Sequence, residues 1–170
     1  MKSYELEFYA HLGLLAVKFA QMEYKLSAIV GKLFGTDDDL IPMTVLENNS
    51  LSMNIGLLKK LNRIQNFQKP VVTDLIQQII KIQSDRNLFI HGIWSTPDES
   101  DGSVIIICDE KRIKYEEKYE HSWKGFDQIW YHSKKHIFSL SDIKKRINDL
   151  NDILATQDSL IKDLENYDFI

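Results

Sequence analysis

Apolar residues recur at alternating spacings of three and four along residues 4–34, which predicts one long helix with a bundle or coiled-coil seam. The seam residues are Phe8, Leu12, Leu15, Phe19, Met22, Leu26, Ile29 and Leu33. Gly35 is expected to end this helix, and the acidic run Asp37 to Asp39 with Pro42 is expected to form the connection that follows.

Three further helices follow from the same kind of pattern. The second begins near Ser50 or Ser52 and places Ile55, Leu58, Leu61 and Ile64 inward. The third has Pro70 in its first turn and ends at about Gly92. Ser139 or Ser141 caps the last long helix, whose buried face is expected to hold a row of branched apolar residues. That row is Ile143, Ile147, Leu150, Ile153 or Leu154, Leu160, Ile161 and Leu164.

The stretch from about 94 to 138 has a different pattern. Turn-forming residues precede Val104 to Ile107, which reads as a strand. A short turn around Asp109 and Glu110 is predicted next, with 112–119 pairing as a hairpin and a further strand or extended arm over 128–138. We therefore expect a mainly α fold: residues 1–170 form a single domain, an antiparallel helical bundle with a small antiparallel β hairpin or sheet inserted between the third and last long helices.

Helical phasing of the third helix places one charge in its apolar stripe. The stripe residues are Val72, Leu75, Ile76, Ile79, Ile82, Phe89, Ile90 and Ile93. Arg86 falls near the centre of this stripe, and Asn87 and His91 fall near its edge. A buried guanidinium needs an anion or an open cleft, because an unpaired buried charge costs several kcal/mol or more. Glu23 is the candidate partner for Arg86, since it is the one charge in a row of small residues on the first helix, namely Gly13, Ala16, Ala20 and Ser27.

The net charge of −4 argues against a protein that coats nucleic acid non-specifically, but the charge is unevenly distributed. Residues 52–93 are the basic part of the chain, which indicates either a surface for an anionic partner or a solvated helix face. The cations there are Lys59, Lys60, Arg63, Lys69, Lys81 and Arg86, against Asp74 and Asp85. Cys108 is the one cysteine, and no leader or bilayer-length apolar run is seen, so we expect a cytoplasmic protein with no membrane partner.

The stretch RNLFIHG, from Arg86 to Gly92, resembles the motif of the HEPN domain family. That motif is an Arg, a polar residue directly after it, and a His separated from the Arg by four to six intervening residues; Arg86, Asn87 and His91 match the form with four. The resemblance covers roughly residues 4–93 and 139–166. It implies a helical bundle that commonly dimerises with the two motifs facing each other across a basic cleft. Many HEPN domains are metal-independent endoribonucleases of toxin–antitoxin or antiviral systems.

The resemblance also implies roles for the three motif residues. His91 would transfer a proton at the 2′-hydroxyl or at the leaving 5′-oxygen, Arg86 would hold the scissile phosphate, and Asn87 would orient His91 or the phosphate. The expected partners are an RNA substrate, a second copy of the chain, and an antitoxin or regulatory protein; no cofactor is expected. Ile93 stands where HEPN toxins controlled by a nucleotidyltransferase often carry a tyrosine.

Two alternatives compete with this interpretation. The chain is then either a catalytically inactive HEPN-like interaction or sensor module, or a plain helical bundle in which Arg86 pairs with a residue such as Glu23 of its own chain. His132 and His136 have the spacing of a helical metal clamp, but Lys134 and Lys135 between them would repel a cation, so no metal site is predicted. The aromatic residues Trp123, Trp130 and Tyr131 are expected to pack the insertion against the bundle rather than stack on bases.

Overall fold

A computed structural model describes residues 2–36, 40–100, 103–120 and 123–169, and the side chains of these residues except 100, 111–120 and 123–133. The chain divides into two compact units. Residues 13–86 and 145–170 form the helical unit, and residues 1–12 and 87–144 form the sheet unit. Three helices contribute to both units: α1 (Ser3–Lys32), α4 (Lys69–His91) and α5 (Leu140–Leu164).

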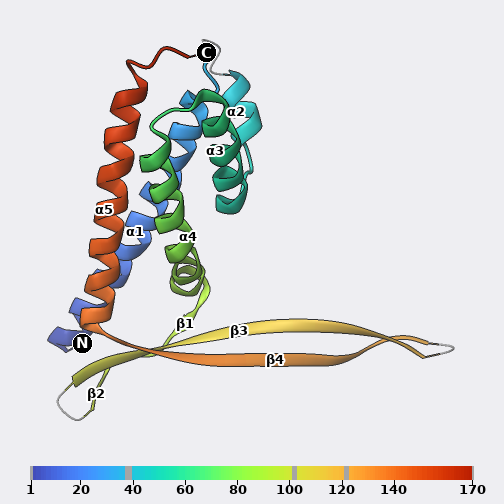
Figure 1. Cartoon of the computed structure of the whole chain (residues 1–170). Helices are drawn as coiled ribbons and strands as arrows, with labels where there is room; N and C mark the ends of the chain where they lie inside the picture. Colours follow the sequence, from blue (N-terminus) through green and yellow to red (C-terminus); the bar gives the residue numbers. More distant parts are fainter. Residues whose placement is uncertain (1, 37–39, 101–102, 121–122, 170) are drawn as a thin grey trace. The chain divides into compact units, whose positions relative to one another are not determined.

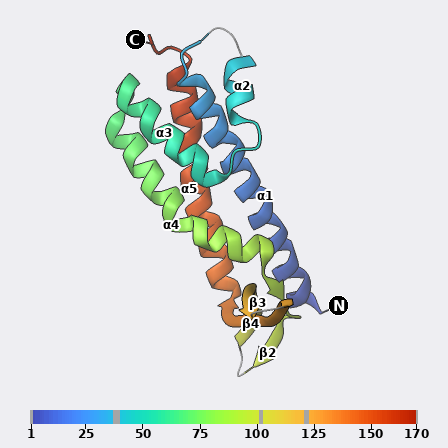
Figure 2. The same ribbon diagram turned by 90° about the vertical axis from the view of Figure 1, so that its right-hand side faces the viewer.

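The helical unit also contains α2 (Leu40–Leu46) and α3 (Leu51–Gln65). α3 and α4 form a helical hairpin (Figure 1), and α1 and α5 lie side by side (Figure 2). Contacts between the helices give their directions: Gln83 in the second half of α4 donates a hydrogen bond to Ser52 at the start of α3, so these two helices are antiparallel. α1 and α5 share one direction, because Lys25 pairs with Asp158 and Lys32 with Glu165. The predicted antiparallel packing thus holds for α3 and α4 but not for α1 and α5.

The core of the helical unit consists of the apolar faces that the sequence pattern marks. The seam of α1 is fully buried from Leu15 to Leu33, and α4 contributes Val72, Leu75, Ile76, Ile79 and Ile82. Ser50 caps α3 by accepting a hydrogen bond from the backbone N–H of Met53, as the sequence predicts. At the C-terminal end, Tyr167 donates a hydrogen bond to the backbone oxygen of Gln65 and packs edge-on against Phe67.

The sheet unit has the long strand β3 (Ser103–Glu120) at its centre. β1 (Ile93–Trp94) and β2 (Asp98–Ser100) pair with one edge of β3, and β4 (Trp123–Ser139) pairs with the other, all antiparallel. Beyond Asp109, β3 has β4 as its only partner among the described strands, and the two form the long ribbon in Figure 1.

One face of this sheet packs on the end of α4. Phe89 of α4 stacks on Trp94 at a ring-centroid distance of 5.2 Å and lies 5.1 Å from Phe138. Ile106 and Cys108 of β3 are fully buried on this face. Apolar contacts and aromatic pairs of this kind fix the last turn of α4 against the sheet.

The prediction of a mainly helical chain with a small antiparallel sheet is confirmed. Two local predictions are wrong. The connection after Gly35 contains α2, in which Pro42 is a buried helical residue. Asp109 and Glu110 do not form a turn but continue β3, because they lie opposite Lys135 and Lys134 of β4, and opposite charges on facing positions stabilise a strand pair. Across the described residues, no helix combines the length and the apolar character needed to span a membrane.

Candidate functional site

The three residues of the predicted site lie in the last turns of α4, with the boundary between the two units falling after Arg86. Arg86 therefore belongs to the helical unit, and Asn87 and His91 belong to the sheet unit. Pro70 in the first turn and Gly92 directly after the last helical residue set the bounds of α4, as the sequence predicts.

Arg86 pairs with Glu23 of α1 through two hydrogen bonds. Its Nε donates to Glu23 Oε1 at 2.6 Å, and its Nη2 donates to Glu23 Oε2 at 3.3 Å. The fork geometry fixes the plane of the guanidinium. Both side chains keep about a quarter to a third of their surface exposed, 26% for Arg86 and 31% for Glu23. The predicted partner of Arg86 is confirmed, and the charge in the apolar stripe is paired within the chain and remains accessible at its surface.

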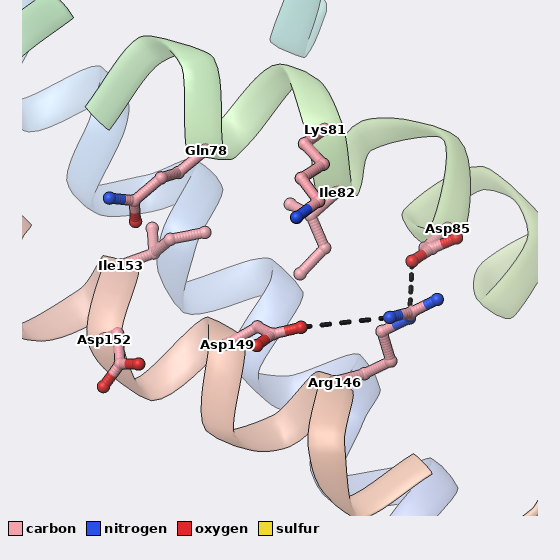
Figure 3. Close-up of a pocket in the computed structure, with 8 residues that line it drawn as sticks. All are labelled: Gln78, Lys81, Ile82, Asp85, Arg146, Asp149, Asp152 and Ile153. Carbon is pink, nitrogen blue, oxygen red and sulfur yellow. Dashed lines mark ion pairs between the residues drawn. The ribbon is translucent and has the colours of Figure 1, made fainter. Parts of the chain in front are cut away.

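The residue before Arg86 makes a second inter-helix ion pair. Arg146 Nε of α5 lies 2.6 Å from Asp85 Oδ2, although its N–H does not point at that oxygen, and Arg146 Nη1 lies 3.9 Å from Asp149. Figure 3 shows Arg146 between these two carboxylates at one end of a pocket of about 290 Å³. Consecutive residues of α4 are thus tied to α5 and to α1. Periodicity along one helix carries no information about how two helices are aligned with each other, so the sequence contained no sign that Arg146 would meet Asp85.

His91 is the last residue of α4 and is exposed, as is Asn87. Within the described part of the chain, the His91 ring has no hydrogen-bond partner. Two residues assigned to the apolar stripe, Ile90 and Ile93, are also exposed, at 40% and 55%. The stripe prediction is wrong at both positions. Ile93 lies beyond the end of α4, in β1, where the helical phase no longer applies, and Ile90 lies in the last turn of α4 with its side chain exposed. An exposed imidazole beside exposed apolar side chains is reachable by a large ligand.

Gly92 lets β3 come into direct contact with the end of α4. Its N–H donates the last helical hydrogen bond to the backbone oxygen of Leu88 at 2.8 Å. A Cβ at this position would lie 2.1 Å from Cys108 Sγ and 2.5 Å from the Leu88 oxygen, so no other residue fits without a shift. The Cys108 thiol in turn lies 3.7 Å from that oxygen. Burial, with smaller effects from Asp109 and Glu110, raises the pKa of the Cys108 thiol to about 11. Cys108 is therefore a packing residue, and it contacts Gly92, the residue after His91.

No family of known proteins, no curated protein and no solved structure matches this chain. A function for the chain must therefore be inferred from its residues and their surroundings.

In the part of the chain whose side chains are described, no three His, Cys, Asp or Glu side chains gather in a way that could hold a metal ion. His136 pairs with Glu110 across the sheet at 3.2 Å, and His11 bonds the backbone oxygen of Glu7 in its own helix. His132 and His136 lie in a strand rather than a helix, and four residues of a strand span about 13 Å, so their spacing is not that of a helical clamp. The side chains of His132, Trp123, Trp130 and Tyr131 lie outside the described ones.

A surface that the sequence did not reveal lies on α2. This helix carries no charged residue, and four of its apolar side chains are exposed between 41% and 70%. They are Leu40, Ile41, Met43 and Val45. A groove of about 770 Å³ runs beside α2 and is lined by residues of α1, α2 and the end of α5. Because six of its seven residues are apolar, the helix has no periodicity from which its position could be predicted.

Proposed function

We propose that the chain is a metal-independent endoribonuclease of the HEPN type, in which Arg86 and His91 act on an RNA phosphodiester. The observation that carries the proposal is the exposure of His91 at the end of α4, on the same helix as a partly exposed Arg86. A histidine that served only to pack a core would be buried with its ring nitrogens bonded. An arginine whose plane is fixed by one carboxylate is preorganised to bind the oxygens of a phosphate.

The proposed reaction is an internal transfer at phosphorus. The 2′-oxygen of a ribose attacks the adjacent phosphorus, and the bond from phosphorus to the 5′-oxygen breaks. A proton leaves the 2′-hydroxyl and a proton is given to the 5′-oxygen, and an imidazole can serve either step because it titrates near neutral pH. Arg86 binds the phosphate and stabilises its developing charge, and Asn87 orients His91 or the phosphate. The products are a 2′,3′-cyclic phosphate and a free 5′-hydroxyl.

One histidine cannot act as base and acid at the same moment, so the proposal includes a homodimer that brings two copies of the motif together. It also includes a HEPN-like arrangement of the long helices, with the sheet as an insertion, and a cytoplasmic toxin or antiviral role in which an antitoxin or regulatory protein restrains the activity. The helix arrangement, the localisation and the biological role are supported by the motif resemblance alone.

The test is incubation of the purified protein with RNA in the presence of EDTA. Wild type is expected to produce fragments that end in 2′,3′-cyclic phosphate, and His91→Ala is expected to produce none. His11→Ala is the matched control, because His11 is only partly buried and bonds only its own helix. RNA that stays intact with wild type, or equal cleavage by His91→Ala, would overturn the proposal.

A second function, a catalytically inactive interaction module, is favoured by two observations. Glu23 neutralises Arg86 within the chain, and α2 presents an uncharged apolar surface of the kind that marks protein contact sites. In cells, this alternative predicts equal growth effects of wild type and His91→Ala, together with loss of the effect in Met43→Lys. The ribonuclease function predicts instead that His91→Ala loses the growth effect, so the two variants separate the functions.

A further inference from the structure

The segment from Asn48 to Thr73 contains no acidic residue in a chain whose net charge is −4. Its four cations, Lys59, Lys60, Arg63 and Lys69, are all exposed. None of them forms an ion pair among the described residues, whereas cations of α1 and α5 such as Lys25, Lys32 and Arg146 do. Three of the four lie on α3. The positive charge of α3 is therefore directed to solvent rather than used within the fold.

The cations of α3 gather on one side of the helix. Lys59 and Arg63 lie one helical turn apart, and Lys60 follows Lys59, so the three fall within an arc of about 100°. Like charges at positions four apart destabilise a helix by a few tenths of a kcal/mol. No acidic residue of α3 offsets this repulsion. An anionic partner would turn the repulsion into attraction.

Gly56 lies within the same arc, in the interior of α3 and one turn before Lys59 and Lys60. A glycine in a helix interior costs roughly 0.5–1 kcal/mol relative to alanine. Here no packing requires it, because a Cβ at Gly56 would meet no atom within 4 Å. The missing side chain leaves the helix backbone open to a partner that approaches closely. This is a second, independent indication that the face binds a ligand.

We infer that this basic face, made of Gly56, Lys59, Lys60 and Arg63, binds the sugar–phosphate backbone of RNA. The inference rests on the proposed ribonuclease function and adds a surface that holds the substrate away from the reacting phosphate. α3 has no aromatic residue on which bases could stack, so the contact is mainly electrostatic and independent of sequence. The face sets how tightly long RNA binds, and Arg86 and His91 set where it is cut.

The direct test measures binding of a single-stranded RNA of about 20 nucleotides by fluorescence anisotropy, in a His91→Ala background that prevents cleavage. Each lost phosphate contact lowers the slope of log affinity against log salt by about 0.7, so K59Q/K60Q/R63Q is expected to lower it by about 2. The ratio of the affinity of the protein with the intact basic face to that of K59Q/K60Q/R63Q then falls about 20-fold as salt rises from 50 to 200 mM. The matched control is K18Q/K145Q/K162Q, which changes the charge equally on α1 and α5 and should leave the slope near its original value.

Gly56→Ala gives a readout that a stability effect cannot mimic. Alanine should raise the melting temperature, because it favours the helix, and yet lower RNA affinity several-fold, because a methyl group covers the open backbone. Equal slopes for the two triple variants, or unchanged affinity in Gly56→Ala, would overturn the inference.

Cleavage of a dinucleotide separates this inference from the proposed function. A dinucleotide carries a single phosphodiester, which cannot occupy the motif and the basic face at once, so K59Q/K60Q/R63Q should cleave it at the wild-type rate while cleaving long RNA more slowly. If wild type cleaves neither substrate, the proposed function fails, and the anisotropy measurement still decides whether the face binds RNA.

Discussion

The hydrogen-bonded pair between Arg86 and Glu23 allows a quantitative prediction of stability. Glu23→Ala removes two charge-assisted hydrogen bonds and leaves a partly buried guanidinium without this carboxylate. Losing the partner of a fully buried pair costs about 3–5 kcal/mol, and exposed pairs contribute about 0–1 kcal/mol. Because the two side chains are 26% and 31% exposed, solvent screens part of the interaction. We expect Glu23→Ala to lower the free energy of unfolding by about 1–2 kcal/mol, and the melting temperature by about 2–8 °C.

The assay is a double-mutant cycle on the free energy of unfolding in urea, with Glu23→Ala, Arg86→Ala and the double variant. The pair is expected to show a coupling energy of about 1 kcal/mol. Lys25 and Asp158 provide the control cycle, since this pair joins α1 to α5 and Asp158 is 62% exposed. Its coupling should be smaller. A coupling energy near zero for Glu23 and Arg86 would refute the claim that this carboxylate offsets the buried part of the Arg86 charge.

Three further predictions concern the surroundings of the motif. Gly92→Ala should destabilise the protein by about 1–3 kcal/mol in thermal melts, because its Cβ would collide with Cys108 Sγ and the Leu88 oxygen. Adding Cys108→Ala should restore only part of that loss, since the second collision remains. Burial raises the pKa of the Cys108 thiol from 9.0 to about 11, so the folded state holds its proton more tightly, and stability should fall as pH rises from about 9 to about 11. Alkylation of this thiol by iodoacetamide at pH 8 should be far slower in folded than in urea-unfolded protein. Asp85→Asn should lower stability in urea by about 1 kcal/mol, because Arg146 keeps only the 3.9 Å contact with Asp149.

The helices with strong local signals could be predicted from the sequence. Pro70 and Gly92 bracket α4, Ser50 caps α3, and the three-and-four spacing of α1 marks residues that are buried. These signals are local, because capping and periodicity depend on residues within one or two turns. α2 lacked such a signal, since a short helix with Thr44 as its one polar residue has no amphipathic period.

The error at Asp109 and Glu110 has a different cause. Polar residues within a strand read as a turn when only the local sequence is considered. They are stabilised by Lys134 and Lys135, which lie opposite them across the sheet, and this pairing depends on the long-range register of β3 and β4. The same limit applies to Arg146, which meets Asp85 only because α4 and α5 pack side by side in one register.

The pair between Arg86 and Glu23 changes the argument for a dimer. From the sequence, Arg86 in the apolar stripe had no assured partner, and a cleft between two chains offered one explanation. The structure provides an anion within the chain, so burial of the charge no longer requires a second copy. The case for a dimer then depends on catalysis, because two proton transfers need two groups and each chain offers one exposed histidine in the motif. A dimer that formed without RNA cleavage would leave Arg86 explained by Glu23 alone, whereas cleavage by a protein that stays monomeric would require a second proton-transfer group in the same chain.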